Sequence, residues 1–374
     1  MIYFLINLFN QEQLKQLILR STAAALVSFA VVMIFSPRFI RFLVRKKVGD
    51  RPEFDRVDLN EIMRHKSNTP TMGGLLIVAA ILLSTLLFAN PANFYVRMAM
   101  FAMIWLAALG SVDDWFKLRK AVSNRSRDGL KSWEKILFQI ALGMLLAIFI
   151  YSHGRLGMYD DFTGRTINAV QHFYLPFKTD PIPLALWGFV LITIVTMVGS
   201  SNAVNLTDGM DGLAGGCMLI VSCVFLVLAW IAGVKGWANF LHLPFVPDAA
   251  ELAVVCASMA GACAGFLWYN CNPAQFFMGD TGSLPLGGLI GYIAVVTRQE
   301  MILFIAGGVF VMEALSVVMQ VFYFKATKGK RIFRCAPIHH HFHLGGWPEP
   351  KVVVRFWLLA VLFAAIALAS LKLR

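Results

Sequence analysis

The sequence predicts an all-α integral membrane protein, folded as a single domain (residues 1–374) around a bundle of about ten transmembrane helices. Two observations predict this class. The chain is 58% hydrophobic and only 14% charged, with a mean hydropathy of +0.69, which excludes an ordinary soluble domain. The apolar residues also gather into runs close to the ~20 residues that cross the ~30 Å hydrocarbon core of a bilayer.

The predicted spans follow one another along the whole chain. They are 17–36, 71–89, 94–112, 136–152, 183–201, 213–232, 251–269, 284–297, 301–324 and 352–371, of which 136–152 and 284–297 are short. The linkers are short except for 37–70, 113–135, 153–182 and 325–351. The six cysteines include no Cys-x-x-Cys pair, so we expect neither a disulfide framework nor a thiolate metal site.

The basic residues predict the orientation of the bundle. The linkers 37–70, 113–135 and 325–351 hold nine, seven and six Lys and Arg residues, and with ten spans they share one side. The positive-inside rule places that side in the cytoplasm. Both termini and the linker 153–182, with three basic and three acidic residues, are then periplasmic. The polar segments 202–212 and 270–283 fall on the cytoplasmic face.

The stretch from Asn202 to Gly212 is a polar interruption between two apolar runs. It contains Asn202, Asn205, Asp208 and Asp211 within eleven residues. Ionisable groups at the edge of a membrane are costly and usually functional. Asp211 could also cap the helix that begins near residue 213. The alternative interpretation of the stretch is a tight turn rich in Asp and Asn.

Two acidic motifs fall on the same predicted face. Asp113 and Asp114 are adjacent, and neighbouring carboxylates raise each other's pKa unless a cation lies nearby. Mg²⁺ prefers carboxylate oxygens, with phosphates and water completing its shell. Lys117 and the other basic residues of this linker favour phosphate chemistry over a solvated acidic pair. Asp280, in Phe277-Met-Gly-Asp280-Thr-Gly-Ser, precedes another helix.

The segment 64–74 contains Lys66, Thr71 and a Gly73-Gly74 pair at a helix entrance. Paired glycines suit close backbone approach to a ligand, and Lys66 could meet a phosphate. The alternative is a basic loop that contacts anionic lipid head groups.

The last motif is the run His339, His340 and His341 after Ala-Pro-Ile. Histidine can donate to phosphate oxygens or move a proton near neutral pH, but three consecutive residues do not build a zinc site by themselves. Glu313 lies midway along the ninth span, and we expect it to face the bundle interior as a packing or hydrogen-bonding residue.

Acidic residues that can hold Mg²⁺, with cations around them, are what phosphoryl transfer requires. A site at the bilayer boundary further implies one lipid substrate and one water-soluble substrate. The rival from another class is a Mg²⁺ or anion transporter, which would need ionisable residues through the depth of the membrane.

These motifs resemble one enzyme family. Asp113-Asp114, Asn202-Ala-Val-Asn205-Leu-Thr-Asp208-Gly-Met-Asp211-Gly, Phe277-Met-Gly-Asp280-Thr-Gly-Ser and Ala336-Pro-Ile-His339-His340-His341-Phe are similar to those of phospho-N-acetylmuramoyl-pentapeptide transferases. The wider polyprenyl-phosphate N-acetylhexosamine-1-phosphate transferase superfamily shares the acidic motifs, whereas the His run is more specific to this branch. The His run therefore argues against a sibling transferase for another UDP-linked amino sugar. The resemblance extends from Lys66 to Trp357.

The resemblance implies a bacterial inner-membrane enzyme of peptidoglycan synthesis. Such an enzyme transfers phospho-MurNAc-pentapeptide from UDP-MurNAc-pentapeptide to undecaprenyl phosphate, forms lipid I and releases UMP. The resemblance also implies an active-site cleft on the cytoplasmic face, a Mg²⁺ requirement and a homodimer, with no nucleic-acid partner. Because the acceptor phosphate is itself a nucleophile, we favour its direct attack over a covalent Asp intermediate, although both remain open.

The resemblance also assigns roles. Asp280 would be the leading Mg²⁺ ligand, with Asp113 as the second candidate. Asp113 would orient or deprotonate the acceptor phosphate beside Asp114, while Asp208 and His339 would bind or polarise the diphosphate. The implied substrate-binding residues are Lys66, Thr71, Lys117, Asn202, Asn205, Asp211, Asn270, Phe277, His340 and His341, with Phe277 stacking on uracil.

The chain departs from the family pattern in two places. Met63 stands where the family usually has His, and Asn68 where it has Gly. The linker after Asp114 is about two residues longer, which leaves Lys131 and Lys135 without an assigned role.

Overall fold

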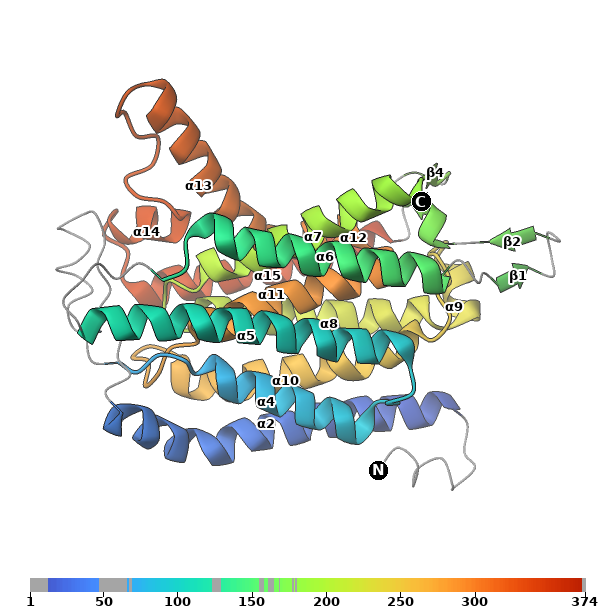
Figure 1. Cartoon of the computed structure of the whole chain (residues 1–374), viewed down its shortest axis with the longest axis horizontal. Coiled ribbons are helices and arrows are strands. Elements are labelled where there is room, and N and C mark those ends of the chain that lie inside the picture. Colours follow the sequence, from blue (N-terminus) through green and yellow to red (C-terminus); the bar gives the residue numbers. More distant parts are fainter. Residues whose placement is uncertain are drawn as a thin grey trace.

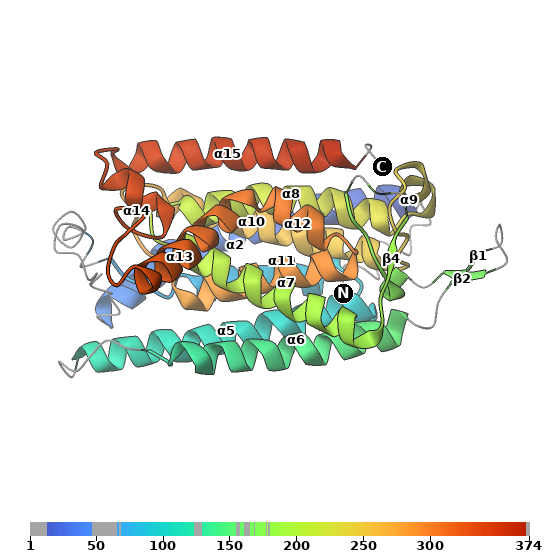
Figure 2. The ribbon, with the colours of Figure 1, turned by 90° about the horizontal axis from the view of Figure 1, so that it is seen from above.

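The apolar runs form long helices that lie side by side in a bundle in the computed structural model of the chain (Figures 1 and 2). The structure describes residues 13–46, 66, 69–122, 129–154, 158–160, 165–167, 169–176, 178 and 180–371. The longer helices are α2 (Gln13–Arg45), α4 (Gly74–Phe88), α5 (Phe94–Val122), α6 (Ser132–Gly154), α7 (Leu186–Thr207), α8 (Leu213–Ala232), α10 (Leu252–Asn270), α11 (Asp280–Val296), α13 (Gly308–Ala326) and α15 (Glu349–Ser370). Three short ones are α9 (Lys235–Phe240), α12 (Glu300–Ala306) and α14 (Ile338–His343).

Every predicted span overlaps at least one helix, but the helices differ in length. Among the described residues, eight helices are long and apolar enough to cross a membrane: α2, α5, α6, α7, α8, α10, α13 and α15. The helices α4 and α11 are apolar but have only 15 and 17 residues. The prediction that 136–152 is a short helix was wrong, because α6 begins at Ser132 and has 23 residues.

The ninth predicted span, 301–324, is not one helix. It is divided at Gly307 into α12 and α13. Glycine is a poor helix residue because its backbone is so free. A Cβ at position 307 would lie 2.8 Å from the Leu303 carbonyl oxygen, so the break also requires the absence of a side chain. Beyond the break, α13 leaves the bundle obliquely (Figures 1 and 2).

The linker 153–182 corrects the all-α prediction. It contains two antiparallel pairs of short strands: β1 (Met158–Asp160) with β2 (Arg165–Ile167), and β3 (His172–Phe173) with β4 (Ile182–Pro183). These strands lie at one end of the bundle (Figure 1). The first described helix begins at this end and the last one finishes there, whereas the acidic motifs lie at the other end.

The short helix α11 is the centre of the bundle. All 17 of its residues are buried. On its face toward α7, Cβ atoms at Gly287 and Gly291 would collide with Ser200. Small residues let membrane helices approach closely without a hydrophobic driving force between them. This packing fixes the N-terminus of α11, and therefore Asp280, against α5 and α7.

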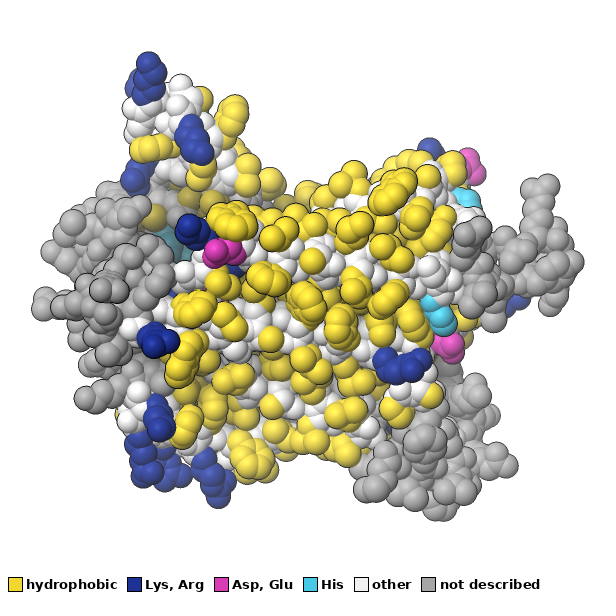
Figure 3. Space-filling view, viewed as in Figure 1, with side chains coloured by type: hydrophobic (Ala, Val, Ile, Leu, Met, Phe, Trp, Pro, Cys, Tyr) yellow, Lys and Arg dark blue, Asp and Glu magenta, His cyan; other side chains and the backbone are white. Residues whose placement is uncertain are grey.

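The outside of the bundle is apolar over its middle. Figure 3 shows hydrophobic side chains covering the helices and most Lys and Arg side chains at the end near the acidic motifs. The large apolar residues Leu26, Trp187 and Leu358, for example, are 63%, 70% and 65% accessible. An apolar surface of this extent is expected for a bundle whose solvent is lipid.

Candidate active site

Asp114 fixes the start of the central helix α11. Its carboxylate accepts hydrogen bonds from the backbone N–H groups of Asp280 (3.2 Å) and Thr281 (2.9 Å), and from the Thr281 hydroxyl (2.6 Å). The first N–H groups of a helix have no partner within the helix, and its dipole favours an anion there. Asp114 therefore holds Asp280 in place, and its own oxygens are engaged in doing so.

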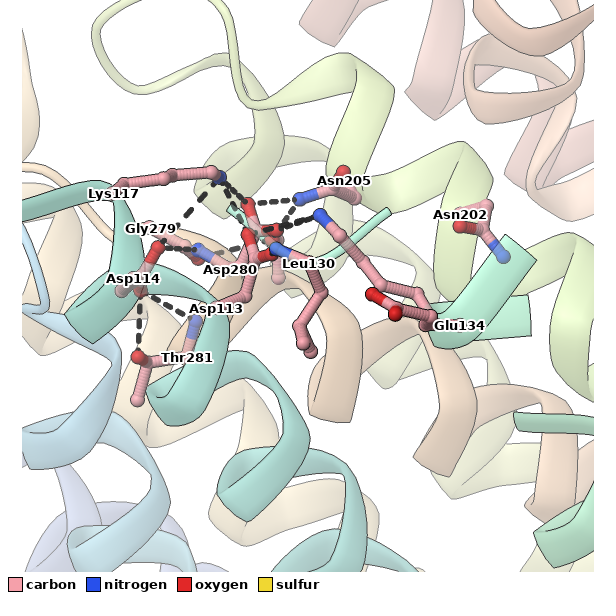
Figure 4. Close-up of polar contacts among 12 residues, drawn as sticks. Asp113, Asp114, Lys117, Leu130, Glu134, Asn202, Asn205, Gly279, Asp280 and Thr281 are labelled. Atoms are coloured by element: carbon pink, nitrogen blue, oxygen red, sulfur yellow. Dashed lines mark hydrogen bonds and ion pairs between the residues drawn. The ribbon is translucent and has the colours of Figure 1, made fainter. Parts of the chain in front are cut away.

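Asp113 and Asp280 share two lysines (Figure 4). Lys117, one turn after Asp113 on α5, lies 2.8 Å from Asp113 and 3.2 Å from Asp280. Lys135, in the first turn of α6, lies 2.9 Å from Asp113 and 2.8 Å from Asp280. The backbone N–H of Leu130 donates a further hydrogen bond to Asp113 at 2.7 Å. Residues far apart in sequence thus form one charged cluster.

The two Asn residues of α7 have different hydrogen-bond partners. Asn205 donates its amide to Asp280 (2.8 Å) and to the Ser283 hydroxyl (2.9 Å), so it belongs to the cluster. Asn202, one turn earlier, donates to the Gln139 side chain at 2.7 Å and to the Val198 carbonyl. It points away from the cluster (Figure 4).

The cluster has the chemistry of a cation site. Asp113, Asp114 and Asp280 each offer one carboxylate oxygen, and these atoms lie within 4.8 Å of one another. Hard oxygen ligands of this kind suit Mg²⁺, which usually takes one or two carboxylates. The Asp114 oxygens already bind the α11 terminus, so Asp113 and Asp280 are the better ligands.

Asp208 lies beside the cluster, immediately after α7. It accepts a hydrogen bond from the Gly279 backbone. Burial, followed by the negative charges of Asp280 and Asp114, holds the pKa of Asp208 well above its usual range. The carboxyl of Asp208 therefore favours its neutral form until a cation reaches the cluster.

The side chain of His339 is oriented by a contact with Glu313. Its Nδ1 lies 3.0 Å from Glu313 Oε2, and both side chains are fully buried. The other nitrogen, Nε2, has no hydrogen-bond partner among the described residues and lies against Gly209, where a Cβ would collide with it. A carboxylate on one ring nitrogen fixes the direction of the other. Glu313 is thus a hydrogen-bonding residue, as predicted, but its partner is a candidate catalytic histidine.

The other two histidines of the run differ. His340 is buried, and burial together with the charges of His339, His343 and Lys66 lowers its pKa to about 2, so its ring stays neutral. Its Nε2 also lies close to Gly209. His341 accepts a hydrogen bond from the Arg334 backbone at 3.0 Å and packs against the Phe333 ring. His341, which lies within α14, thus holds the loop that precedes this helix.

A second charged cluster lies beyond Gly209. The ammonium group of Lys66 pairs with the carboxylates of Asp211 and Glu349. Glu349 also accepts the backbone N–H of Asp211 at 2.7 Å, and the Asp211 carboxylate accepts the N–H of Ala274 at 3.0 Å. All three charged side chains are at most 6% exposed. The prediction that Asp211 caps α8 was wrong, because its side chain is taken up by this cluster and Gly212 is the capping residue.

Asn270 and Phe277 border this second cluster. Asn270 accepts the backbone N–H of Gly212 at 2.9 Å and donates to the Phe276 carbonyl at 2.8 Å. The ring of Phe277 is partly exposed, with the Lys66 ammonium group 5.8 Å from its centre. Lys66, Asp211, Asn270 and Phe277, predicted to form one pocket, therefore do lie together.

The glycine pair after Thr71 contacts protein and not an open ligand site. The N–H groups of Gly73 and Gly74 donate to the carbonyls of Phe277 (2.8 Å) and Met278 (2.9 Å). A Cβ at either glycine would collide with the segment 276–282. Thr71 itself is buried next to Gly279. The backbone does approach a neighbour closely at these glycines, as predicted, but the neighbour is the protein segment before α11 and not a ligand. The departures at Met63 and Asn68 lie outside the described residues.

Comparison with known proteins identifies the family of this chain. The profile of glycosyl transferase family 4 matches residues 96–298, and signature 1 of the phospho-N-acetylmuramoyl-pentapeptide-transferases matches residues 66–78. The chain is 44% identical over 360 residues to the phospho-N-acetylmuramoyl-pentapeptide-transferase of Desulfotalea psychrophila, covering 96% of this chain and 95% of that protein. The chain belongs to the phospho-N-acetylmuramoyl-pentapeptide-transferase family. The resemblance inferred from the motifs is thereby confirmed.

Sequence reasoning missed two charged residues that this transferase chain places at the site. Lys135 was left without a role, although it lies within reach of Asp113 and Asp280. Its signal was a lysine on the first turn of the helix that follows the Asp pair. Glu349 had no predicted role, and its signal was an acidic residue between two prolines at a helix start. Only the fold brings Glu349 to Lys66.

Proposed function

We propose that this chain transfers phospho-MurNAc-pentapeptide from UDP-MurNAc-pentapeptide to undecaprenyl phosphate, giving lipid I and UMP in peptidoglycan synthesis. One observation carries the proposal: the cluster of Asp113, Asp280, Lys117 and Lys135 joins helices of a chain in the pentapeptide-transferase family. Carboxylates for a cation and ammonium groups for phosphate oxygens are the parts that phosphoryl transfer needs.

Mg²⁺ is the cation that we propose for Asp280 and Asp113. When bound, it would neutralise the diphosphate oxygens and stabilise charge on the departing phosphate. The two lysines that hold these carboxylates are partly exposed, Lys117 at 33% and Lys135 at 18%. They can therefore turn from the carboxylates to phosphate oxygens once substrates and a cation enter.

The proposed reaction has one displacement at phosphorus. An oxygen of the undecaprenyl phosphate attacks the phosphorus bonded to the sugar. The bond from that phosphorus to the bridging oxygen breaks, and UMP leaves with the electron pair. Lys117 and Lys135 would stabilise the charge that develops on the phosphate oxygens. Asp113 is completely buried and bonded to Leu130, Lys117 and Lys135, an environment that suits orientation better than nucleophilic attack and supports direct transfer.

The turn from Asp208 to Gly212 connects the reaction centre to the proposed nucleotide pocket. Phe277 would stack on uracil, while Asp211 and Asn270 shape the pocket beside it. His339, directed by Glu313, presents Nε2 next to Gly209 and, in its protonated form, would donate to a diphosphate oxygen. Burial leaves this nitrogen without another described partner, and a buried unpaired group binds a ligand oxygen well.

We propose that the isoprenoid chain of the lipid acceptor lies in an apolar groove on the side of the bundle. A groove of about 500 Å³ runs between α7 and the α12–α13 pair, lined mainly by apolar residues. Leu191, Val195, Phe304 and Phe310 are among them. An isoprenoid chain has no polar group to satisfy there, so apolar contact alone can hold it.

The orientation belongs to the same proposal. With α4, α11 and the α12–α13 pair counted as spans, the bundle has ten, both termini are periplasmic and the active site faces the cytoplasm of the inner membrane. The basic linkers near the acidic motifs support this orientation. A homodimer is proposed from the family resemblance alone.

The deciding experiment measures UMP release by purified protein from UDP-MurNAc-pentapeptide, with and without undecaprenyl phosphate and Mg²⁺. Release that needs both additions is the expected result. Equal release from another UDP-linked amino sugar phosphate would favour the sibling transferase. Ion flux through reconstituted protein without UMP release would favour the transporter.

A further inference from the structure

The end of α13 stands away from the bundle near the candidate active site (Figure 1). Residues 321–334, here called the α13 tip, comprise its last turns and the loop that follows. Every side chain from Val321 to Phe324 is exposed, and Phe322 is 74% accessible. Ile332, across the loop, is exposed as well. Large apolar side chains exposed in such a group mark a surface for a partner or a membrane.

The α13 tip is also basic. Its exposed cations are Lys325, Lys328, Lys330 and Arg331, and dark blue side chains crown the projecting arm in Figure 3. No Asp or Glu occurs in the sequence between Glu313 and Glu349. In the part of the chain that the structure describes, none of the four has a carboxylate partner, and the Arg331 guanidinium lies over the Phe324 ring at 5.8 Å. Among the described residues, these four charges of the α13 tip are therefore not neutralised by a neighbouring carboxylate.

We propose that the α13 tip binds the head groups of anionic phospholipids in the leaflet that faces the active site. Aromatic side chains settle at the level of the head groups, and clustered Lys and Arg beside a membrane helix attract anionic lipids. The order along the chain fits this arrangement, since the apolar residues 321–324 come before the four cations. An acidic protein could pair with the cations but would leave the exposed apolar residues 321–324 uncovered. A bilayer rich in phosphatidylglycerol covers both.

The binding has a consequence for the groove beside α13. The first half of the helix lines the groove with Phe310, Val311 and Leu315, opposite Leu191 and Val195 of α7. A tip held by head groups keeps the outer half of α13 away from α7, so the groove stays open to the bilayer. This consequence rests on the proposed function, because it concerns entry of the lipid acceptor.

The test compares two variants that each lose four positive charges. The tip variant carries Lys325→Gln, Lys328→Gln, Lys330→Gln and Arg331→Gln. The control variant carries Arg38→Gln, Arg41→Gln, Arg45→Gln and Lys46→Gln at the end of α2, whose basic residues are equally exposed but which packs along α10 in the bundle. Each protein is placed in nanodiscs of equal phosphatidylglycerol and phosphatidylcholine, and native mass spectrometry counts the lipids that it retains.

Wild-type protein should retain phosphatidylglycerol in preference to phosphatidylcholine, and the α2 variant should lose less of this preference than the tip variant. The tip variant should lose this preference on the order of tenfold, since each cation near an anionic surface contributes separately. Equal loss in both variants, or no loss in either, would overturn the proposal, as would an unchanged lipid preference with loss of a co-purifying acidic protein. This readout needs no turnover, so it stands apart from the proposed function. In active protein, the tip variant should also show a raised KM for undecaprenyl phosphate in phosphatidylglycerol vesicles, with kcat unchanged.

Discussion

Two clusters of carboxylates and lysines lie at the same end of this bundle, and they are built differently. In the first, Asp113 and Asp280 share Lys117 and Lys135, whose side chains are 33% and 18% exposed. In the second, Lys66 is enclosed by Asp211 and Glu349, and none of the three exceeds 6%. The lysines of the first cluster are therefore more accessible to solvent than the charged groups of the second.

The difference indicates which cluster can exchange partners. An exposed lysine that leaves a carboxylate regains hydration, so the exchange is nearly balanced. A buried charge that loses its partner has no such compensation, and breaking a buried pair by removing one member costs roughly 3–5 kcal/mol. The first cluster can therefore admit Mg²⁺ and phosphate, whereas the second is suited to hold the Asp208–Gly212 turn in one shape.

The first cluster (Asp113, Asp280, Lys117 and Lys135) is here called the open cluster, and the second (Lys66, Asp211 and Glu349) the closed cluster. The largest expected effect comes from the open cluster. Asp280→Asn removes a proposed Mg²⁺ ligand and should lower kcat on the order of 10³-fold, because charge stabilisation is the main catalytic contribution in phosphoryl transfer. The amide can still accept from Asn205, so the protein should fold. UMP release measured over a range of Mg²⁺ concentrations, with the thermal unfolding midpoint as the folding control, checks this. Turnover equal to wild type would remove Asp280 from the metal role.

A second prediction separates the cation site from the lysines that occupy it. Lys135→Gln should lower kcat on the order of 10²-fold, since one charge that stabilises phosphate oxygens is lost. The same change should tighten Mg²⁺ binding in the absence of substrates, on the order of tenfold, because a competing positive charge near Asp113 and Asp280 is gone. Isothermal titration with Mg²⁺ measures the second effect. Weaker Mg²⁺ binding would show that Lys135 supports the cation site and does not compete with it.

Much of the open cluster could be predicted from sequence, because its carboxylates stand in short motifs beside apolar runs. Asp113 and Asp114 directly follow the predicted span 94–112, and Asp280 shortly precedes the predicted span 284–297, so the order of spans alone brings them to one face. The closed cluster could not be predicted in the same way. Glu349 reaches Lys66 only because α15 packs beside α8, and no spacing in the sequence encodes that distance.

The same limit explains the errors in the fold. Periodicity and length found the long helices, but they do not tell that Gly307 breaks the ninth run or that Gly73 and Gly74 meet the segment before α11. Both features depend on which tertiary neighbours lie where a glycine has no Cβ. Asp211 was predicted as a cap because its position in sequence fits one, and the tertiary partners of its carboxylate override that preference.

The closed cluster should respond to Glu349→Gln in a different manner. Glutamine can still accept from the Asp211 backbone, but it no longer carries the charge that pairs with Lys66. The KM for the UDP-linked donor should rise on the order of tenfold, with kcat and the acceptor KM nearly unchanged, because the affected turn borders only the proposed nucleotide pocket. Steady-state kinetics with each substrate varied separately makes the distinction. A fall in kcat with unchanged donor KM would place Glu349 with the reaction centre instead.

The smallest effect concerns the residue between the clusters and is a dependence of stability on pH. The folded pKa of Asp208 is raised above its ordinary value of 3.8 by burial and by the charges of Asp280 and Asp114. Its neutral form is therefore the stable one, and the folded state loses stability as pH rises from about 4 through the raised pKa. Asp208→Asn removes this loss, so without Mg²⁺ the variant should unfold a few degrees above wild type at about pH 8 and at nearly the same temperature at about pH 4. Added Mg²⁺ should reduce the difference at pH 8, because a cation beside Asp280 favours the ionised form of Asp208. A gap in unfolding temperature that is the same at both pH values would mean that the charges of the open cluster do not extend to Asp208.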